Sequence, residues 1–251
     1  EIGKLREGSI FVSLLWPLQN PDLAKALAEK KVTAIGLESI PRTTLAQAMD
    51  VLSSQASLAG YWAVVAAAER LPKIFPLMMT PAGTISPSRI LVMGAGVAGL
   101  QAIATARRLG AVVQAYDVRP AVKEQIESLG AEFIELQIDA GDSEDAGGYA
   151  KAQDEAFYRR QREELAKVAG QNDVVVTTAA IPGQPSPLLI TADAVRAMDP
   201  GSVIVDLASE RGGNCELTRP GETIVEDGVQ IMGPLNLPAA VPNHASQMYS
   251  H

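Results

Sequence analysis

The segment from residue 88 to residue 119 constrains the fold of this chain more than any other. An apolar run of four residues (ILVM) leads directly into Gly94-x-Gly96-x-x-Gly99, and a helical pattern of apolar residues follows. A second apolar run then ends at Asp117. The order strand, glycine turn, helix, strand and acid is the dinucleotide-binding fingerprint in the context that it requires.

Each part of this segment has a physical role. Gly94 allows the tight turn, Gly96 lets a pyrophosphate approach the main chain, and Gly99 lets the helix pack close to the sheet. The helix N-terminus offers unpaired N–H groups and a partial positive charge to phosphates. Asp117 is expected to accept hydrogen bonds from the adenosine ribose, which favours NAD over NADP, while Arg119 is expected to stay in solvent or bind elsewhere. The alternative is a tight turn without a ligand.

Composition narrows the class of protein. The chain has 251 residues, enough for one large or two modest domains, and 47% of them are hydrophobic. A net charge of −8 argues against a nucleic-acid partner. The single cysteine, Cys215, is expected to be a buried thiol, and the two histidines, His244 and His251, lie at the C-terminal end. A histidine-rich metal site and a Ser-His-Asp triad are therefore nearly excluded.

Helical and strand patterns alternate along the whole chain, which indicates an α/β fold. The first part reads as strand 9–16, helix 20–30 and strand 32–37, a βαβ-like unit. A long helical pattern runs from Leu45 to Leu71, and residues 80–88 read as a connector into the nucleotide fold. The longest apolar stretch is too short to cross a membrane, so direct membrane insertion is not expected.

Two loops follow predicted strands in the second half of the chain, at residues 177–183 and 208–216. Because ligands bind at the carboxyl ends of strands in an open parallel sheet, both loops are expected near the nicotinamide half of a cofactor. A polar insertion at residues 137–150 contains one aromatic residue, Tyr149. It fits a plain surface loop and a lid over a ligand equally well.

Outside the nucleotide fold, the richest polar group comprises Arg42, Gln47, Asp50 and Ser53. The last three are spaced i, i+3 and i+6, so the spacing predicts that they lie along one side of a helix. On spacing alone, a capped helix start with a solvated polar stripe is the favoured interpretation.

Three stretches of sequence resemble the NAD(H)-binding component of proton-translocating nicotinamide nucleotide transhydrogenase. They read GLESIPRTTLAQAMDVLSSQASLAGY, AYDVRPAVKEQIESLGAEF and SVIVDLASERGGNCELT, and the resemblance, with the glycine fingerprint, covers essentially the whole chain. It implies two Rossmann-like domains with parallel sheets and NAD(H) in the cleft between them. The expected domains are residues 1–55, incomplete at the N-terminus, and residues 56–238, with a return segment at 239–251.

The resemblance also implies an activity and an assembly. Hydride passes directly between NADH and NADP+, which is held on a separate NADP(H)-binding component. A membrane-spanning component couples this transfer to proton movement. The chain is expected to form a homodimer that is cytoplasmic and peripheral on the inner membrane, or on the matrix side in a mitochondrion.

The family's cleft residues map onto the polar group named above. The resemblance assigns catalytic roles to Arg42, Gln47 and Asp50, with the glutamine and aspartate holding the nicotinamide. A second arginine of the family is Leu45 here, which puts the role of that charge in doubt. The residues predicted to bind the cofactor are Ser53, Gly94, Gly96, Val97, Ala98, Gly99, Asp117, Val118, Arg119, Tyr149, Thr178, Ala179, Ala180 and Asn214.

Alanine dehydrogenase, a relative in fold, is the rival. The segment of those enzymes that resembles residues 15–21 carries the catalytic histidine, which this chain lacks there, and their catalytic aspartate aligns with Glu210. Hydride exchange between two nicotinamides moves no proton at a heteroatom, so it needs no acid or base, and proximity and orientation suffice. A stand-alone NAD-dependent amino-acid dehydrogenase and a non-catalytic NAD-binding sensor remain the alternatives.

Overall fold

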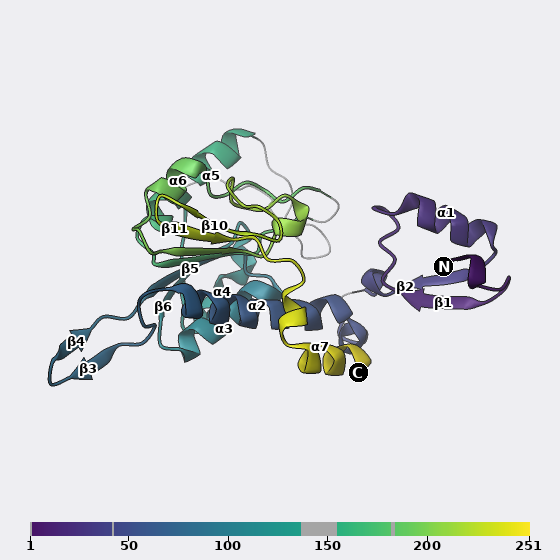
Figure 1. Cartoon of the computed structure of the whole chain (residues 1–251), viewed down its shortest axis with the longest axis horizontal. Coiled ribbons are helices and arrows are strands. Elements are labelled where there is room, and N and C mark those ends of the chain that lie inside the picture. The colour runs from purple at the N-terminus through teal and green to yellow at the C-terminus, as the bar shows by residue number, and fades with distance from the viewer. Residues whose placement is uncertain (1, 42, 137–154, 182–183) are drawn as a thin grey trace. The chain divides into compact units, whose positions relative to one another are not determined.

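The chain divides into two compact units. One comprises residues 1–55 with 243–251, and the other comprises residues 56–242. Figure 1 shows the helices and strands of both. The computed structural model describes four stretches of the chain: residues 2–41, 43–136, 155–181 and 184–251.

The first unit contains a small parallel sheet. Strands β1 (Ile10–Ser13) and β2 (Thr33–Gly36) pair in parallel, and helix α1 (Pro21–Glu29) connects them. The helix begins at its proline as the sequence predicts, because the first N–H of a helix has no helical partner to lose. Leu27 packs with Leu15 in a small core between helix and sheet. The predicted βαβ-like unit is confirmed.

Short 3₁₀ turns and a C-terminal helix complete this unit. The turns are Ile2–Lys4, Leu37–Ser39 and Gln47–Met49. Helix α7 (Pro242–Ser250) follows a further 3₁₀ turn, and the side-chain amide of Gln55 donates a hydrogen bond to the carbonyl of Ala245. The end of the chain is therefore held to the same unit as its beginning.

A seven-stranded sheet forms the centre of the second unit, in the order β10-β11-β9-β8-β5-β6-β7. All neighbouring strands are parallel except β10 and β11. From β7 to β11 the order is that of a doubly wound dinucleotide-binding sheet, and it reverses between β5 and β8. The strands are β5 (Arg89–Met93), β6 (Val112–Tyr116), β7 (Glu132–Phe133), β8 (Val174–Thr177), β9 (Val203–Asp206), β10 (Thr223–Glu226) and β11 (Val229–Met232).

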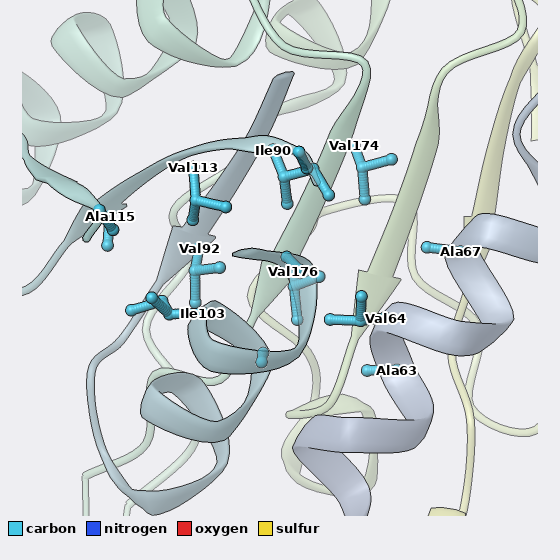
Figure 2. Packing of buried hydrophobic residues seen from close by; sticks show 14 of the residues in the cluster. Ala63, Val64, Ala67, Ile90, Val92, Ile103, Val113, Ala115, Val174 and Val176 are labelled. Atoms are coloured by element: carbon cyan, nitrogen blue, oxygen red, sulfur yellow. The ribbon is translucent and has the colours of Figure 1, made fainter. Parts of the chain in front are cut away.

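Helices cover both faces of this sheet. Ile90 and Val92 face one core with α2 and α3, whereas Leu91 and Met93 face the other with α5 and α6. Figure 2 shows the first core, where side chains of α2 and α3 meet the strands. Strands buried on both faces read as continuous apolar runs, which is why the sequence identified them. The helices are α2 (Val51–Arg70), α3 (Val97–Arg108), α4 (Lys123–Ser128), α5 (Glu155–Ala169) and α6 (Ala192–Arg196).

Helix α2 differs from its prediction at its start. It begins at Val51, not Leu45, because the residues before it form a separate 3₁₀ turn. Its 20 residues are apolar enough to cross a membrane by length and composition alone. Ala63, Val64 and Ala67 are nevertheless fully buried in the first core. The apolar window is 33% buried, and these three residues show that the second half of the helix packs in this core.

An exposed hairpin precedes β5. Strands β3 (Met78–Thr80) and β4 (Gly83–Ile85) pair in antiparallel fashion, and every residue in both is exposed. In Figure 1 the hairpin extends away from the sheet that contains β5. The expectation that residues 80–88 form only a connector is wrong for β4. Such a hairpin has no buried face, so it leaves no periodic apolar signal.

Candidate functional site

The glycine turn connects β5 to α3 at the point where the strand order reverses. Gly94 has a φ of +98°, a left-handed conformation that side chains disfavour, and its N–H donates to the carbonyl of Tyr116. A Cβ on Gly99 would collide with the carbonyl oxygen of Gly94. The turn and the helix start are therefore packed against each other, and larger residues do not fit at either position.

Gly96 differs from these two glycines. A Cβ built there meets nothing within 4 Å, and the residue is exposed. It caps α3 without any side-chain hydrogen bond, and the first helical bond is from the Leu100 N–H to its carbonyl. The space beside Gly96 is therefore open, and the first amides of α3, which include those of Val97 and Ala98, have no acceptor within the helix. This arrangement suits an anionic group such as a pyrophosphate.

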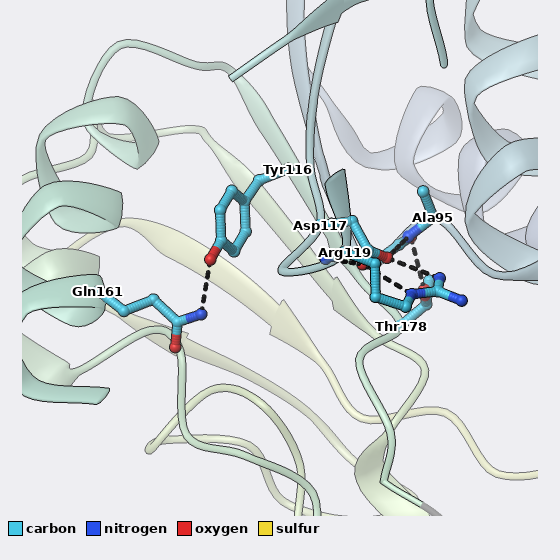
Figure 3. A network of polar contacts seen from close by, with 7 residues as sticks. Ala95, Tyr116, Asp117, Arg119, Gln161 and Thr178 are labelled. Carbon is cyan, nitrogen blue, oxygen red and sulfur yellow. Dashed lines mark hydrogen bonds and ion pairs between the residues drawn. The ribbon is translucent and has the colours of Figure 1, made fainter. Parts of the chain in front are cut away.

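Asp117 follows β6 and is buried beside this turn. Its carboxylate accepts a hydrogen bond of 2.7 Å from the Ala95 N–H. The guanidinium of Arg119 donates to both carboxylate oxygens at 2.9 Å, and the Arg119 main-chain N–H donates at 2.9 Å as well. Figure 3 shows this group. The expectation that Arg119 stays in solvent is wrong, because its side chain is only 15% exposed and is paired with Asp117.

Tyr116, the last residue of β6, carries a buried phenol. The side-chain amide of Gln161 on α5 donates to the phenol oxygen at 2.8 Å (Figure 3). Burial raises the pKa of Tyr116 to about 12. The phenol is therefore neutral at physiological pH and joins α5 to the strand that ends beside Asp117.

The loop after β8 lies directly against the glycine turn. The hydroxyl of Thr178 donates to the Gly94 carbonyl at 2.9 Å, and its N–H donates to the Met93 carbonyl. Ala179 is held by Asn214, whose amide oxygen accepts from its N–H and whose amide nitrogen donates to its carbonyl. Ala180 is exposed beyond them. The structure therefore brings this loop together with the fingerprint.

Asn214 is fully buried, and both the oxygen and the nitrogen of its side-chain amide are hydrogen-bonded to main-chain groups. Besides Ala179, it donates to the carbonyl of Pro187 at 2.8 Å. Asn214 therefore orients the loop by its side chain. A contact between this amide and a cofactor would require these bonds to be exchanged.

Asp206, at the end of β9, is absent from the residues that the sequence predicted for the site. It is 0% exposed and accepts five hydrogen bonds, four from the two loops expected near the nicotinamide and one from the hydroxyl of Thr218. A buried strand that ends in aspartate (SVIVD) was a signal that could have identified it. Cys215, beside it, is buried as expected, and burial raises the pKa of its thiol.

The polar group of the first unit is arranged differently from its prediction. Gln47 lies in the 3₁₀ turn and is exposed, whereas Asp50 is buried and precedes α2. The Asp50 carboxylate accepts from the N–H and the hydroxyl of Ser53 at 3.0 and 2.6 Å, an N-cap arrangement. The three side chains therefore do not share one side of a helix. Arg42 lies outside the described residues.

The sequence also singles out Tyr149 and Glu210. Tyr149 and the polar insertion around it also lie outside the described residues. Glu210, which aligns with the aspartate of alanine dehydrogenases, is exposed and accepts a hydrogen bond from the Asn236 N–H at 3.1 Å. Within the described stretches, no group of three or more His, Cys, Asp or Glu residues is placed to hold a metal.

Comparisons with known proteins agree with this geometry. The C-terminal domain of "Alanine dehydrogenase/PNT" matches residues 63–251, and the N-terminal domain of the same family matches residues 1–59. A solved structure of transhydrogenase from Sinorhizobium meliloti is similar, with a TM-score of 0.88 and 46% identity. It is matched over 100% of this chain and 68% of that chain.

Two curated relatives show how similar this chain is to a transhydrogenase subunit and to an alanine dehydrogenase. One relative is the first section of NAD(P) transhydrogenase subunit alpha from Rhodospirillum rubrum. It is 50% identical over 251 residues, which cover this whole chain and 65% of that protein. Alanine dehydrogenase of Bacillus subtilis is 27% identical over 94% of this chain and 58% of that protein. The chain thus spans slightly less than two thirds of its transhydrogenase relative. It belongs to the alanine dehydrogenase/PNT family, in which its sequence is closer to a transhydrogenase alpha subunit than to an alanine dehydrogenase.

Proposed function

We propose that this chain is the NAD(H)-binding component of a proton-translocating transhydrogenase. It holds NAD(H) while hydride passes directly between NADH and NADP+ on a partner component. The observation that carries the proposal is the contrast in identity, 50% to a transhydrogenase subunit over the whole chain against 27% to an alanine dehydrogenase.

The adenosine and pyrophosphate end of NAD(H) is assigned to the glycine turn. The open space beside Gly96 and the amides of Val97 and Ala98 suit the pyrophosphate. Asp117 would accept the ribose hydroxyls, with Val118 and Arg119 beside it. Because four N–H groups already fill the carboxylate of Asp117, ribose binding requires the guanidinium of Arg119 to move.

The nicotinamide end is assigned to two sets of residues. Thr178, Ala179, Ala180 and Asn214 form the first set, on the loops after β8 and β9. Gln47, Asp50 and Ser53 form the second, together with Arg42 and Tyr149. Gln47 is exposed and so is free to meet a ring, whereas the buried Asp50 acts by fixing the start of α2.

Orientation is the chemical contribution of these residues. The nicotinamide supplies or accepts the hydride when NAD(H) is bound. No proton leaves a heteroatom in such an exchange, so the chain has to hold the ring, restrict its rotation and exclude water. Glu210, which aligns with the catalytic aspartate of alanine dehydrogenases, is exposed and accepts a hydrogen bond from the Asn236 N–H.

The proposed partners are an NADP(H)-binding component and a membrane-spanning component of the same complex. We propose that the chain acts as a homodimer at the cytoplasmic face of that membrane, or at the matrix face in a mitochondrion. The exposed apolar residues Met78, Met79 and Ile85 of the hairpin support self-association.

The decisive experiment mixes the chain with its NADP(H)-binding component, NADPH and an NAD+ analogue whose reduced form absorbs at a separate wavelength. We expect reduction of the analogue and no turnover of alanine with NAD+. Turnover of alanine or another amino acid, without transfer between nucleotides, would contradict the proposal. Binding of NADH without any turnover would favour a sensor.

Gln47→Asn tests the role of the exposed glutamine. A side chain shorter by one methylene is expected to slow hydride transfer by about tenfold or more while NADH affinity changes less, because misplacement of the ring affects the transition state first. Gln19→Asn makes the same change at another exposed position of the first unit. Equal losses of rate and affinity in Gln47→Asn would argue against a positioning role.

A further inference from the structure

Asp206 has an unusual environment for a carboxylate. It is fully buried, and its five hydrogen-bond donors are uncharged N–H and O–H groups. The buried charge is therefore stabilised by dipoles alone, an arrangement that is costly unless each bond is formed. The donors and their distances are Thr177 Oγ1 at 2.9 Å and Ala208 N at 3.0 Å to Oδ1, with Asn214 N at 2.8 Å, Cys215 N at 3.1 Å and Thr218 Oγ1 at 2.7 Å to Oδ2.

These donors belong to different parts of the chain. Thr177 ends the neighbouring strand β8, and the other donors lie on the loop that follows β9. Gly213 has a φ of +82°, and a Cβ there would lie 2.6 Å from Oδ2 of Asp206. The loop thus wraps closely around the carboxylate, which connects the end of β8 to the loop after β9.

The effect of Asp206 extends to the glycine turn through three residues. Its Oδ2 fixes the main chain of Asn214, whose amide holds both the N–H and the carbonyl of Ala179. The adjacent Thr178 bonds to the Gly94 carbonyl. Each contact in this series has an ordinary hydrogen-bond length, so a continuous series of hydrogen bonds links Asp206 to the loop after β8 and to the fingerprint.

We propose that Asp206 is a positioning residue for hydride transfer. It acts through Asn214 and Thr177 to hold the loop at residues 178–180 where the nicotinamide half of NAD(H) binds, and it does not touch the cofactor. This inference rests on the proposed function and adds to it the residue that orders the reactive end. A displacement of about 1 Å at a reacting group can cost on the order of a hundredfold in rate.

Asp206→Asn is the main test, measured with the full chain in complex with its NADP(H)-binding component. The asparagine oxygen can still accept from the groups at Oδ2, so its amide nitrogen then faces the Ala208 N–H, and the fold is strained locally. We expect the single-turnover rate of hydride transfer to fall about tenfold or more, whereas the Kd for NADH rises less than about threefold. The adenosine end, anchored elsewhere, retains most of the affinity.

Asp173→Asn provides the matched control. Asp173 precedes β8 at the opposite edge of the same sheet, where it accepts from the Arg89 N–H at 2.8 Å and pairs with Lys73. Loss of this carboxylate should lower Tm without changing the ratio of rate to affinity. Thr177→Val removes one donor to Asp206 with little change of shape, and it should give the same split as Asp206→Asn to a smaller extent.

The outcomes separate the two proposals. An Asp206→Asn protein that loses rate and affinity by the same factor, or loses only Tm as Asp173→Asn does, would overturn the positioning role. If Asp206→Asn fails to fold, Thr177→Val decides, and an unchanged rate in that variant overturns the inference. A wild-type chain that binds no NADH, or transfers no hydride, would instead contradict the proposed function.

Discussion

Asp117 and Asp206 are two aspartates at the same edge of one sheet, yet their surroundings differ. Asp117 follows β6 and Asp206 ends β9, so both lie where the parallel strands end. Asp117 is paired with Arg119, two residues away, whose side chain is 15% exposed. Asp206 accepts only uncharged donors, and they come from β8 and from the loop after β9.

The two carboxylates differ in whether their hydrogen-bond donors can move away. The guanidinium of Arg119 is a side-chain group, and under the proposed function it would move away from Asp117 when a ribose binds. The donors to Asp206 are parts of the fold and cannot leave without unfolding two loops. Under the proposed function, two aspartates at equivalent ends of strands thus serve a ligand in one case and the protein itself in the other.

The largest effect is expected from Asp206→Ala. It leaves buried N–H and O–H donors without partners, so the free energy of unfolding should fall by about 3–5 kcal/mol, as measured by urea denaturation. Asp193→Ala is the control, because that side chain is 92% exposed and should change stability by less than about 0.5 kcal/mol. A loss below about 1 kcal/mol in Asp206→Ala would remove the distinction between the two aspartates.

Asp117→Ala should act on the ligand more than on the fold. Loss of a charged acceptor for the ribose should weaken NADH binding by about 10- to 100-fold in calorimetric titration. Discrimination against NADPH should also relax, because the freed guanidinium of Arg119 can meet a 2′-phosphate. Unchanged affinity and selectivity would place the ribose elsewhere.

Tyr116→Phe tests the residue beside Asp117. Removal of the hydroxyl leaves Gln161 without its partner and should cost about 1 kcal/mol at neutral pH. The phenol has a pKa of about 12 in the folded chain, against an ordinary value of 10.0. The stability that this group contributes is therefore fully present below pH 10 and is lost as the pH rises towards 12. Thermal melts across that range should show a shallower decline for the variant. Parallel curves would mean that burial does not raise the pKa of this phenol.

The smallest effect on ligand binding is expected from Arg119→Met. The variant keeps two main-chain donors on Asp117 but removes the charged partner of a buried carboxylate, so the free energy of unfolding should fall by about 1–3 kcal/mol. NADH affinity should stay the same or rise by up to about threefold, since the ribose no longer competes with the guanidinium. A loss as large as that in Asp117→Ala would show that Arg119 itself binds the cofactor.

The sequence was sufficient for the nucleotide fold because its signals are local. Apolar runs identified the buried strands, and the positive φ of Gly94 and the close packing of Gly99 match the roles predicted for them. The helix before this fold was placed too early, at Leu45. An i, i+3, i+6 spacing fits a helix, but Asp50 caps α2 from outside and Gln47 belongs to a 3₁₀ turn.

By itself, the sequence determined the α/β class, the glycine turn and the acid after β6, since each depends on residues that are neighbours along the chain. Only the tertiary structure decided what that acid is bonded to and why Asp206 matters. Thr177 and Asn214 are separated from Asp206 by 29 and 8 positions along the chain; strand pairing brings Thr177 to Asp206, and the loop after β9 folds back to bring Asn214. A hydrogen-bond network of this kind has no period or spacing, so it becomes visible only when the sheet is formed.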